Sequence, residues 1–270
     1  MKLAGSVLLV AVAGLACCDT LDYSNWSIRL AARETVGTTV APGPELSSRG
    51  LKLLLNALYD DNQSVGDYLL MNPKIGRKLD QLHLQATQAG NKFLSDGTVS
   101  TEYGIPLTGQ VLQTLMPKTG GGVPVGPMSC PICGQPWPED KEVPPGITLI
   151  PLEEGAPTNY TGVLIDARGS DLNPALFPRI LNQEGRIVYG PEFFLPTYAS
   201  DRGSVGYYDQ MSGAYADDRA GYNPLRITAL RAAGRNSTDL IISDPDAKKL
   251  HGSLENLKLL ERCRVIILTD

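Results

Sequence analysis

The chain has 270 residues, of which 42% are hydrophobic and 20% charged. This composition is that of a folded protein with a sizeable core, and it excludes a disordered chain. The 24 basic and 29 acidic side chains give a net charge of −5, or −6 once Lys2 is removed, and no basic cluster interrupts them. We therefore expect no binding to nucleic acid or to anionic lipid surfaces through charge.

Residues 1–18 have the pattern of an export signal. Lys2 precedes an apolar run over residues 3–16, and Cys17 and Cys18 follow it. The run is too short to span a bilayer core of roughly 30 Å. A cysteine at its end favours a bacterial lipoprotein signal with the lipid on Cys17 or Cys18, whereas cleavage after Ala16 would leave both thiols in a soluble exported protein. Either reading predicts export to the periplasm or the outer membrane.

A segment rich in proline and glycine divides the rest of the chain. Residues 117–146 hold eight prolines and six glycines, which oppose regular structure. The roughly 250 residues beyond the signal fit two domains of about 100 to 200 residues. We therefore predict an N-terminal domain over residues 19–116, a linker over 117–146 and a C-terminal domain over 147–270.

The N-terminal half predicts helices around a β-hairpin. Ser47 or Ser48 can cap a first helix, and Asn72 followed by Pro73 is typical of a second helix start. The inner face of the first helix is leucine-rich, with Leu51, Leu54, Leu55 and Leu58 at helical spacing.

The hairpin follows those helices. Residues 83–94 and 98–107 alternate as strands, and Gly97 supplies the positive φ of the turn between them. A last helix over residues 108–116 ends before Pro117, which cannot continue it.

The C-terminal half predicts strands with a few helix signals. A hairpin is expected over 179–189, and Ser243 before Asp244 and Pro245 is a strong helix start. The other expected strands cover residues 147–152, 162–167, 225–232, 238–242 and 263–268. The sequence thus predicts an α+β protein, with two small mixed domains whose sheets are mainly antiparallel.

Several of these segments resemble a known family. In the N-terminal half, residues 91–99 (NKFLSDGTV) and 105–112 (IPLTGQVL) resemble the Lpp-twenty type of bacterial lipoprotein domain, which is related to flagellar assembly protein T. In the C-terminal half, residues 161–169 (TGVLIDARG), 223–225 (NPL) and 238–243 (TDLIIS) are similar to a region that often accompanies this domain.

The resemblance implies a non-catalytic envelope protein, with a structural or assembly role that extends to surface appendages or motility. It supplies no catalytic residues. Expected partners are envelope proteins or other copies of the chain, and a membrane if Cys17 or Cys18 is lipidated. The linker cysteines depart from the family pattern.

Cys130 and Cys133 are the clearest candidates for chemistry. Their CxxC spacing suits one metal ion, but tetrahedral zinc needs four ligands and the sequence contains no second pair of this kind. Cys263, His83, His251 or a second subunit are candidates to complete the site. A local disulfide, inert thiols and a redox pair are the alternatives, although Pro136 and Pro138 oppose the helix that a redox pair normally needs. Zinc is therefore the one cofactor that we consider.

Other candidates are weaker. His83 and His251 are the only histidines, and no Gly-x-Ser-x-Gly motif accompanies them, so we expect no hydrolase. The family resemblance implies more broadly that the protein is not an enzyme. Asp217, Asp218 and Arg219 are expected in a solvated loop. Four tyrosines in a glycine-rich stretch are candidate partner contacts, because tyrosine offers a rigid contact surface: Tyr207, Tyr208, Tyr215 and Tyr222.

Overall fold

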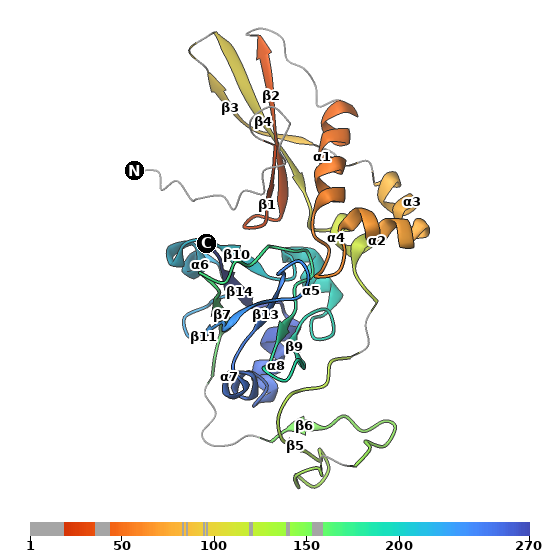
Figure 1. Cartoon of the computed structure of the whole chain (residues 1–270), viewed down its shortest axis with the longest axis vertical. Coiled ribbons are helices and arrows are strands. Elements are labelled where there is room, and N and C mark those ends of the chain that lie inside the picture. The colour runs from red at the N-terminus through yellow and green to blue at the C-terminus, as the bar shows by residue number, and fades with distance from the viewer. Residues whose placement is uncertain are drawn as a thin grey trace.

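The computed structural model describes residues 19–35, 44–82, 84, 86–93, 95, 97–118, 121–138, 141–152 and 159–270. These residues form an N-terminal half, a C-terminal half and an arm that extends from the C-terminal half (Figure 1). Helices accompany both antiparallel and parallel sheets, so the predicted α+β class with two domains is confirmed. Among the described residues, no helix is both long enough and apolar enough to cross a bilayer.

The N-terminal half contains a four-stranded antiparallel sheet in the order β1-β2-β4-β3. Its predicted hairpin is confirmed, although the first strand begins at Thr87 rather than at residue 83. The strands are β1 (Thr20–Asp22), β2 (Ser27–Thr35), β3 (Thr87–Phe93) and β4 (Thr98–Pro106). Buried side chains alternate along the paired strands β2 and β4, as expected of a sheet with one face in the core: Ile28, Leu30, Tyr103 and Ile105.

The described part of this half has four helices: α1 (Pro44–Asn56), α2 (Val65–Met71), α3 (Pro73–Gln81) and α4 (Gln110–Leu115). The start of α3 at Asn72-Pro73 and the last helix are confirmed, whereas a first helix capped by Ser47 or Ser48 is wrong. That helix begins at Pro44, and the Ser47 hydroxyl instead donates to the Leu84 carbonyl at 2.6 Å. Gly50 lets α1 approach the sheet, because a Cβ there would lie 2.5 Å from the Ile105 side chain.

The central sheet of the C-terminal half is parallel, in the order β10-β14-β7-β11. Mainly antiparallel pairing in this half is therefore wrong. The strands are β7 (Gly162–Asp166), β10 (Gly206–Tyr208), β11 (Pro224–Thr228) and β14 (Val265–Leu268). Every residue of β14 and the first four of β7 are buried, as in parallel strands covered on both faces, and helices occupy the connections between strands.

A second sheet has the order β12-β13-β8-β9. Its strands are β8 (Ile180–Leu181), β9 (Ile187–Tyr189), β12 (Arg231–Ala233) and β13 (Asp239–Ile241), and the antiparallel β8–β9 pair confirms the predicted hairpin. Residues 225–232, predicted as one strand, divide between the two sheets. The division occurs because the Ala229 N–H bonds to Asp166 of the first sheet, and the Leu230 N–H to Ile241 of the second.

Four helices complete the C-terminal half: α5 (Pro196–Arg202), α6 (Met211–Ala216), α7 (Asp244–Leu250) and α8 (Leu254–Glu261). The predicted start at Ser243 is confirmed, since its hydroxyl accepts the Asp246 N–H at 3.2 Å. The sequence did not indicate the other three helices, two of which lack a capping side chain.

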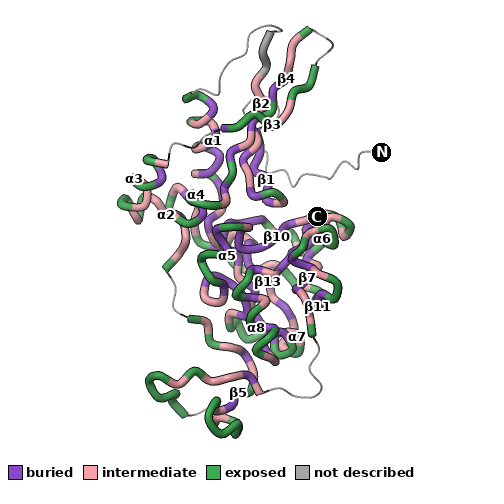
Figure 2. Tube along the Cα trace, turned by 180° about the vertical axis from the view of Figure 1, so that it is seen from behind, coloured by how far each residue is buried: buried purple, intermediate pink, exposed green. Residues whose placement is uncertain are grey.

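In its described residues the arm contains only a two-stranded sheet, β5 (Met128–Ser129) with β6 (Ile150–Pro151). A core strand over residues 147–152 is therefore wrong, because two residues pair there and Ile150 is only half-buried. Figure 2 shows mostly exposed and intermediate residues along the arm, in contrast to the buried interior of the two halves.

The two halves share one continuous apolar core, and we call their contact the junction. The Trp26 ring is buried there, and its Nε1 donates to the Val205 carbonyl at 2.8 Å. Gly203 makes room for this ring, since a Cβ would lie 2.0 Å from Trp26 Cε2. Tyr23 meets Tyr207 edge-on with ring centroids 5.5 Å apart.

A buried carboxylate forms the polar part of the junction. Asp61 follows α1 in the N-terminal half and accepts the backbone N–H groups of Arg235 at 2.6 Å and of Asn236 at 2.9 Å. The Asn236 side chain donates back to the Asp61 carbonyl at 2.8 Å. Position 234 requires glycine, because its φ is +90° and a Cβ would lie 2.0 Å from the Asp61 carboxylate. The junction is thus fixed by specific hydrogen bonds as well as by apolar contact.

Candidate functional site

Three predicted site residues lie outside the described residues: Cys17, Cys18 and His83. Of the other cysteines, Cys133 is exposed, Cys130 is partly exposed and Cys263 is buried, and all three have free thiols.

Cys130 and Cys133 lie in a tight turn at the end of β5, and we call residues 128–137 the knuckle. The Cys130 N–H bonds to the Gln135 carbonyl at 2.9 Å, and the Gly134 N–H bonds to the Cys130 carbonyl at 2.8 Å. Gly134 has a φ of +71°, which glycine adopts without strain. The Trp137 N–H bonds to the Met128 carbonyl at 2.7 Å and closes the loop. The backbone therefore holds both cysteines on one turn.

The knuckle stabilises a thiolate. The backbone N–H groups of Cys133 and Ile132 donate to the Cys130 sulfur, and together with the Cys133 thiol they lower the pKa of Cys130 below its ordinary value. Thiolate is the form that binds soft metal ions. No helix starts at this turn, so the N-terminal helix end that activates a redox pair is missing among the described residues 131–138.

The other predicted ligands do not join the knuckle. Within the described part of the chain, no group of three or more His, Cys, Asp and Glu side chains is placed to hold a metal ion. Cys263 is buried in the C-terminal core, and burial raises the pKa of its thiol to about 12. The knuckle therefore offers two sulfur ligands of the four that tetrahedral zinc requires.

His251 has a structural role instead. Its Nδ1 accepts the Val125 N–H at 2.7 Å, and its Nε2 lies 2.7 Å from the Val188 carbonyl, to which it donates in the neutral ring. Burial lowers the pKa of His251 to about 4. The His251 ring thus connects Val125, at the start of the arm, with Val188 of β9, and both of its nitrogens are occupied.

The four tyrosines separate into different environments. Tyr207 is fully buried in β10 and hydrogen-bonds to the Ala175 carbonyl at 3.2 Å, so its interpretation as a partner contact is wrong. The Tyr208 hydroxyl donates to Asp217 at 3.0 Å, and Tyr215 lies beneath the Arg226 guanidinium, 5.3 Å from the ring centroid. Tyr222 is 87% exposed and Tyr215 is 37% exposed, so these two remain accessible to a partner.

Asp217 and Arg219 form a buried ion pair, so a solvated loop is wrong for both residues. The Arg219 guanidinium lies 2.7 Å from the Asp217 carboxylate, and both side chains are at most 10% exposed. Burial opposes ionisation of Asp217, but the Arg219 charge and hydrogen bonds outweigh it and lower the pKa of this carboxyl. Asp218 alone remains in solvent, 3.1 Å from Arg202. The pair braces α6 against the sheet, which sequence spacing alone could not indicate.

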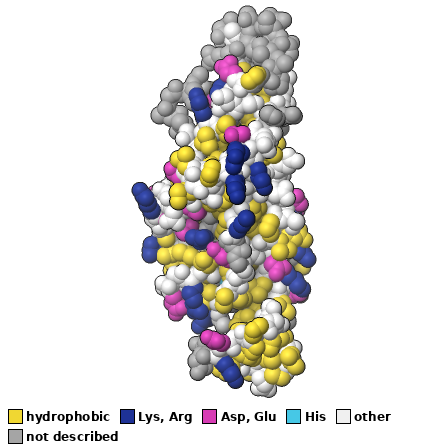
Figure 3. Space-filling view, turned by 90° about the vertical axis from the view of Figure 1, so that its right-hand side faces the viewer, with side chains coloured by type: hydrophobic (Ala, Val, Ile, Leu, Met, Phe, Trp, Pro, Cys, Tyr) yellow, Lys and Arg dark blue, Asp and Glu magenta, His cyan; other side chains and the backbone are white. Residues whose placement is uncertain are grey.

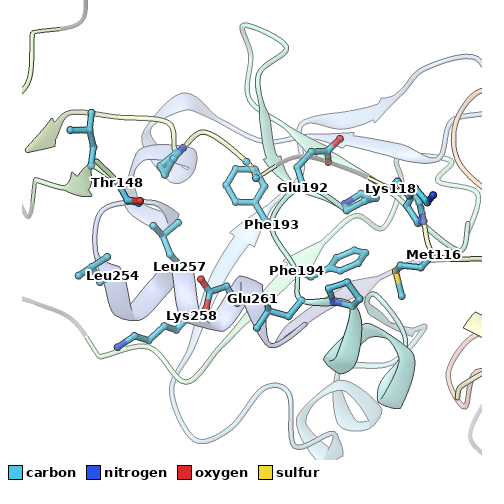
Figure 4. A pocket seen from close by; sticks show the side chains of 18 residues that line it. Met116, Lys118, Thr148, Glu192, Phe193, Phe194, Leu254, Leu257, Lys258 and Glu261 are labelled. Carbon is cyan, nitrogen blue, oxygen red and sulfur yellow. The ribbon is translucent and has the colours of Figure 1, made fainter. Parts of the chain in front are cut away.

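A cavity of about 820 Å³ lies where the arm meets the C-terminal half (Figure 4). Phe193, Phe194 and the α8 residue Leu257 contribute apolar surface, whereas Glu192 lies 3.4 Å from Arg179 and Lys258 lies 2.7 Å from Glu255. Among the described residues that line it, none is a serine, cysteine or histidine. The lining combines apolar surface with a few charged side chains, as ligand-binding clefts do. The sequence did not reveal this cleft because its walls come from distant segments.

Comparison with known proteins gives one match. The family model of the second domain of Tp0624 from Treponema pallidum matches residues 162–270. This region begins at β7 and covers the described C-terminal half. No curated protein matches the chain. The C-terminal half is therefore similar to a domain of a bacterial protein family.

Proposed function

We propose that the protein is a non-catalytic, exported component of a bacterial cell envelope, with a lipid anchor on Cys17 or Cys18 and a structural or assembly role. The apolar residues 3–16 before the cysteine pair supply the sequence support for export. The similarity of residues 162–270 to a Treponema pallidum domain supports a bacterial source.

The observation that carries this proposal is the position of Asp19, directly after Cys18. Asp19 is buried, forms an ion pair with Arg49 and accepts the Ala31 N–H at 3.2 Å. The residue next to Cys18 is therefore fixed within the N-terminal half. A lipid on Cys18 would hold the N-terminal sheet at the membrane surface without a spacer, so the anchor would orient the protein as well as retain it.

An exposed sheet edge supports the assembly role. β3 pairs with β4 on one side and is the last strand of its sheet. Six of its seven residues are exposed, and the side chain of Phe93 is 76% exposed. Strand edges of this kind accept an added strand from a partner. The proposal places envelope proteins at this edge.

The resemblance of the N-terminal half to Lpp-twenty domains and to flagellar assembly protein T gives a finer form of the proposal. In that form the protein is a structural or assembly component of a surface appendage or of the motility apparatus. The family match covers residues 162–270 and does not extend to those families, so the finer assignment remains a prediction.

The test is mass spectrometry of the protein isolated from its native cells, followed by crosslinking in those cells. We expect a mature N-terminus at Cys17 or Cys18 with a diacylglyceryl group, and crosslinks to envelope proteins. Cys17→Ser and Cys18→Ser identify the lipidated residue, since only one of them should release the protein from the membrane. An intact Met1 on a cytoplasmic protein would contradict the proposal.

A second candidate function is metal binding through the knuckle. The specific observation in its favour is the pair of backbone N–H groups that donate to the Cys130 sulfur, because such donors stabilise the ligating thiolate. The Cys130→Ser, Cys133→Ser double variant tests it. Loss of bound zinc with an unchanged fold supports metal binding, and unchanged metal content contradicts it.

A further inference from the structure

We propose that Cys130 and Cys133 bind zinc together with the same two cysteines of a second copy, so that one ion joins two chains. This inference rests on the metal-binding function and on the assembly role proposed above. The four thiolates would form a tetrahedral site, and the four thiol protons would pass to solvent as zinc binds.

The knuckle by itself has too few ligands for a zinc site. Two sulfurs lie on one turn, and within the described residues no third or fourth ligand is near them. The remaining described candidates are committed elsewhere, since Cys263 is buried in the core and both nitrogens of His251 hold backbone groups. Structural zinc takes four protein ligands, so the missing pair must come from outside the turn.

The knuckle also lies far from the other candidate ligands of its own chain. The arm carries the knuckle to the end of the molecule, and the C-terminal half lies between it and α3, whose last residue is close in sequence to His83 (Figure 1). Asp19, next to Cys18, is fixed to α1 by Arg49, also in the N-terminal half. The described neighbours of the remaining candidate ligands are therefore remote from the knuckle, whereas the exposed Cys133 is accessible to another copy.

The surface around the thiols is apolar and exposed. Ile132, between the two cysteines, is 83% exposed, and the prolines Pro131, Pro136 and Pro138 are exposed beside it. Figure 3 shows hydrophobic side chains gathered at this end of the molecule. A two-fold axis through a shared zinc ion would bring two such surfaces together, as a symmetric interface requires. A second copy thus satisfies both the missing ligands and the exposed apolar surface.

The experiment uses the mature full chain, reduced, stripped of metal and titrated with zinc. Light scattering gives its mass and elemental analysis its zinc content. We expect roughly one zinc per two chains, a doubling of mass on zinc addition, and return to monomer with a chelator. When zinc is added, the Cys130→Ser, Cys133→Ser variant should bind none and remain a monomer. Cys133→His should still bind zinc and dimerise, because imidazole also binds zinc.

Ile132→Ser is the matched control, since it changes the apolar tip and keeps both ligands. It should bind zinc and dimerise. One zinc per monomer, a dimer that persists in the double serine variant, or no zinc bound by the reduced chain would each overturn the inference. A native Cys130–Cys133 disulfide would do so as well. None of these results affects the lipid analysis, so failure here and failure of the envelope proposal are distinguishable.

Discussion

The junction and the knuckle use polar atoms in opposite ways. At the junction, the Asp61 carboxylate and the Trp26 indole find their partners within the same chain. At the knuckle, two thiols share one turn and lack further ligands among the described residues. The comparison teaches that a satisfied polar group indicates a structural role, whereas a partly satisfied and accessible group indicates a site for something else. The predictions below test this division.

The largest effect is expected for Trp26→Ala. It removes a fully buried ring, leaves a cavity at the junction and deprives the Val205 carbonyl of its donor, so the free energy of unfolding should fall by about 4 kcal/mol. Trp137→Ala in the arm is the matched control and should cost about 1 kcal/mol or less, because that ring is partly exposed. Denaturant unfolding measures both, and equal losses would refute the contrast.

Asp61→Ala should follow, with a loss of about 3 kcal/mol in unfolding free energy. The change leaves the N–H groups of Arg235 and Asn236 without their acceptor in a partly buried contact. Asp80→Ala on the exposed side of α3 is the control, with an expected change within about 0.5 kcal/mol. If both variants unfold alike, Asp61 does not hold the halves together.

A smaller effect is expected from pH, with opposite signs at two buried groups. Burial lowers the pKa of His251 to about 4, so its contribution to stability is present above pH 6.5 and is lost as pH falls toward 4. Burial raises the pKa of Asp239 to about 6, despite the Arg179 N–H, so its contribution is present below pH 3.8 and is lost as pH rises through 6.

The two variants His251→Gln and Asp239→Asn separate these contributions. Between pH 6.5 and 4, unfolding free energy should rise with acid relative to wild type in His251→Gln and fall relative to wild type in Asp239→Asn, by about 2 kcal/mol each. The other carboxylates contribute equally to the pH dependence of wild type and variant, so their contributions cancel in these differences. Slopes identical to that of wild type would show that neither group titrates with folding.

The smallest effect on stability is expected at the knuckle. The Cys130→Ser, Cys133→Ser variant of the metal-free chain should change unfolding free energy by less than about 0.5 kcal/mol, because these side chains cover little of the core. In the presence of zinc the wild type alone should gain stability, since the ion binds the folded dimer. A large loss without metal would instead assign the cysteines to the fold.

Local turn chemistry made part of the fold predictable. The helix starts at Asn72-Pro73 and Ser243, the hairpin at Gly97 and the turn between β8 and β9 depend on residues a few positions apart. The parallel sheet was missed because its neighbours, such as β7 and β14, are separated by most of the C-terminal half. A continuous apolar run such as residues 265–268 carries no signal of its pairing direction.

Only part of the candidate site could be predicted from the sequence, as was true of the fold. The CxxC spacing identified Cys130 and Cys133, but the exclusion of Cys263 and His251 required knowledge of their burial. Tyr207 and Asp217 were misassigned because a glycine-rich stretch resembles a loop, although here it forms β10 and α6. Long-range packing, and not local propensity, decided these positions.

The central claim is that the knuckle supplies half of a zinc site and that the same two cysteines of a second copy supply the other half. X-ray absorption at the zinc edge of the zinc-loaded, purified chain tests it most directly, because it counts the ligands around the ion. The account predicts four sulfur ligands at about 2.3 Å. Two sulfurs with two nitrogen or oxygen ligands at about 2.0 Å would contradict it, since the second pair would then not be the cysteines of another copy.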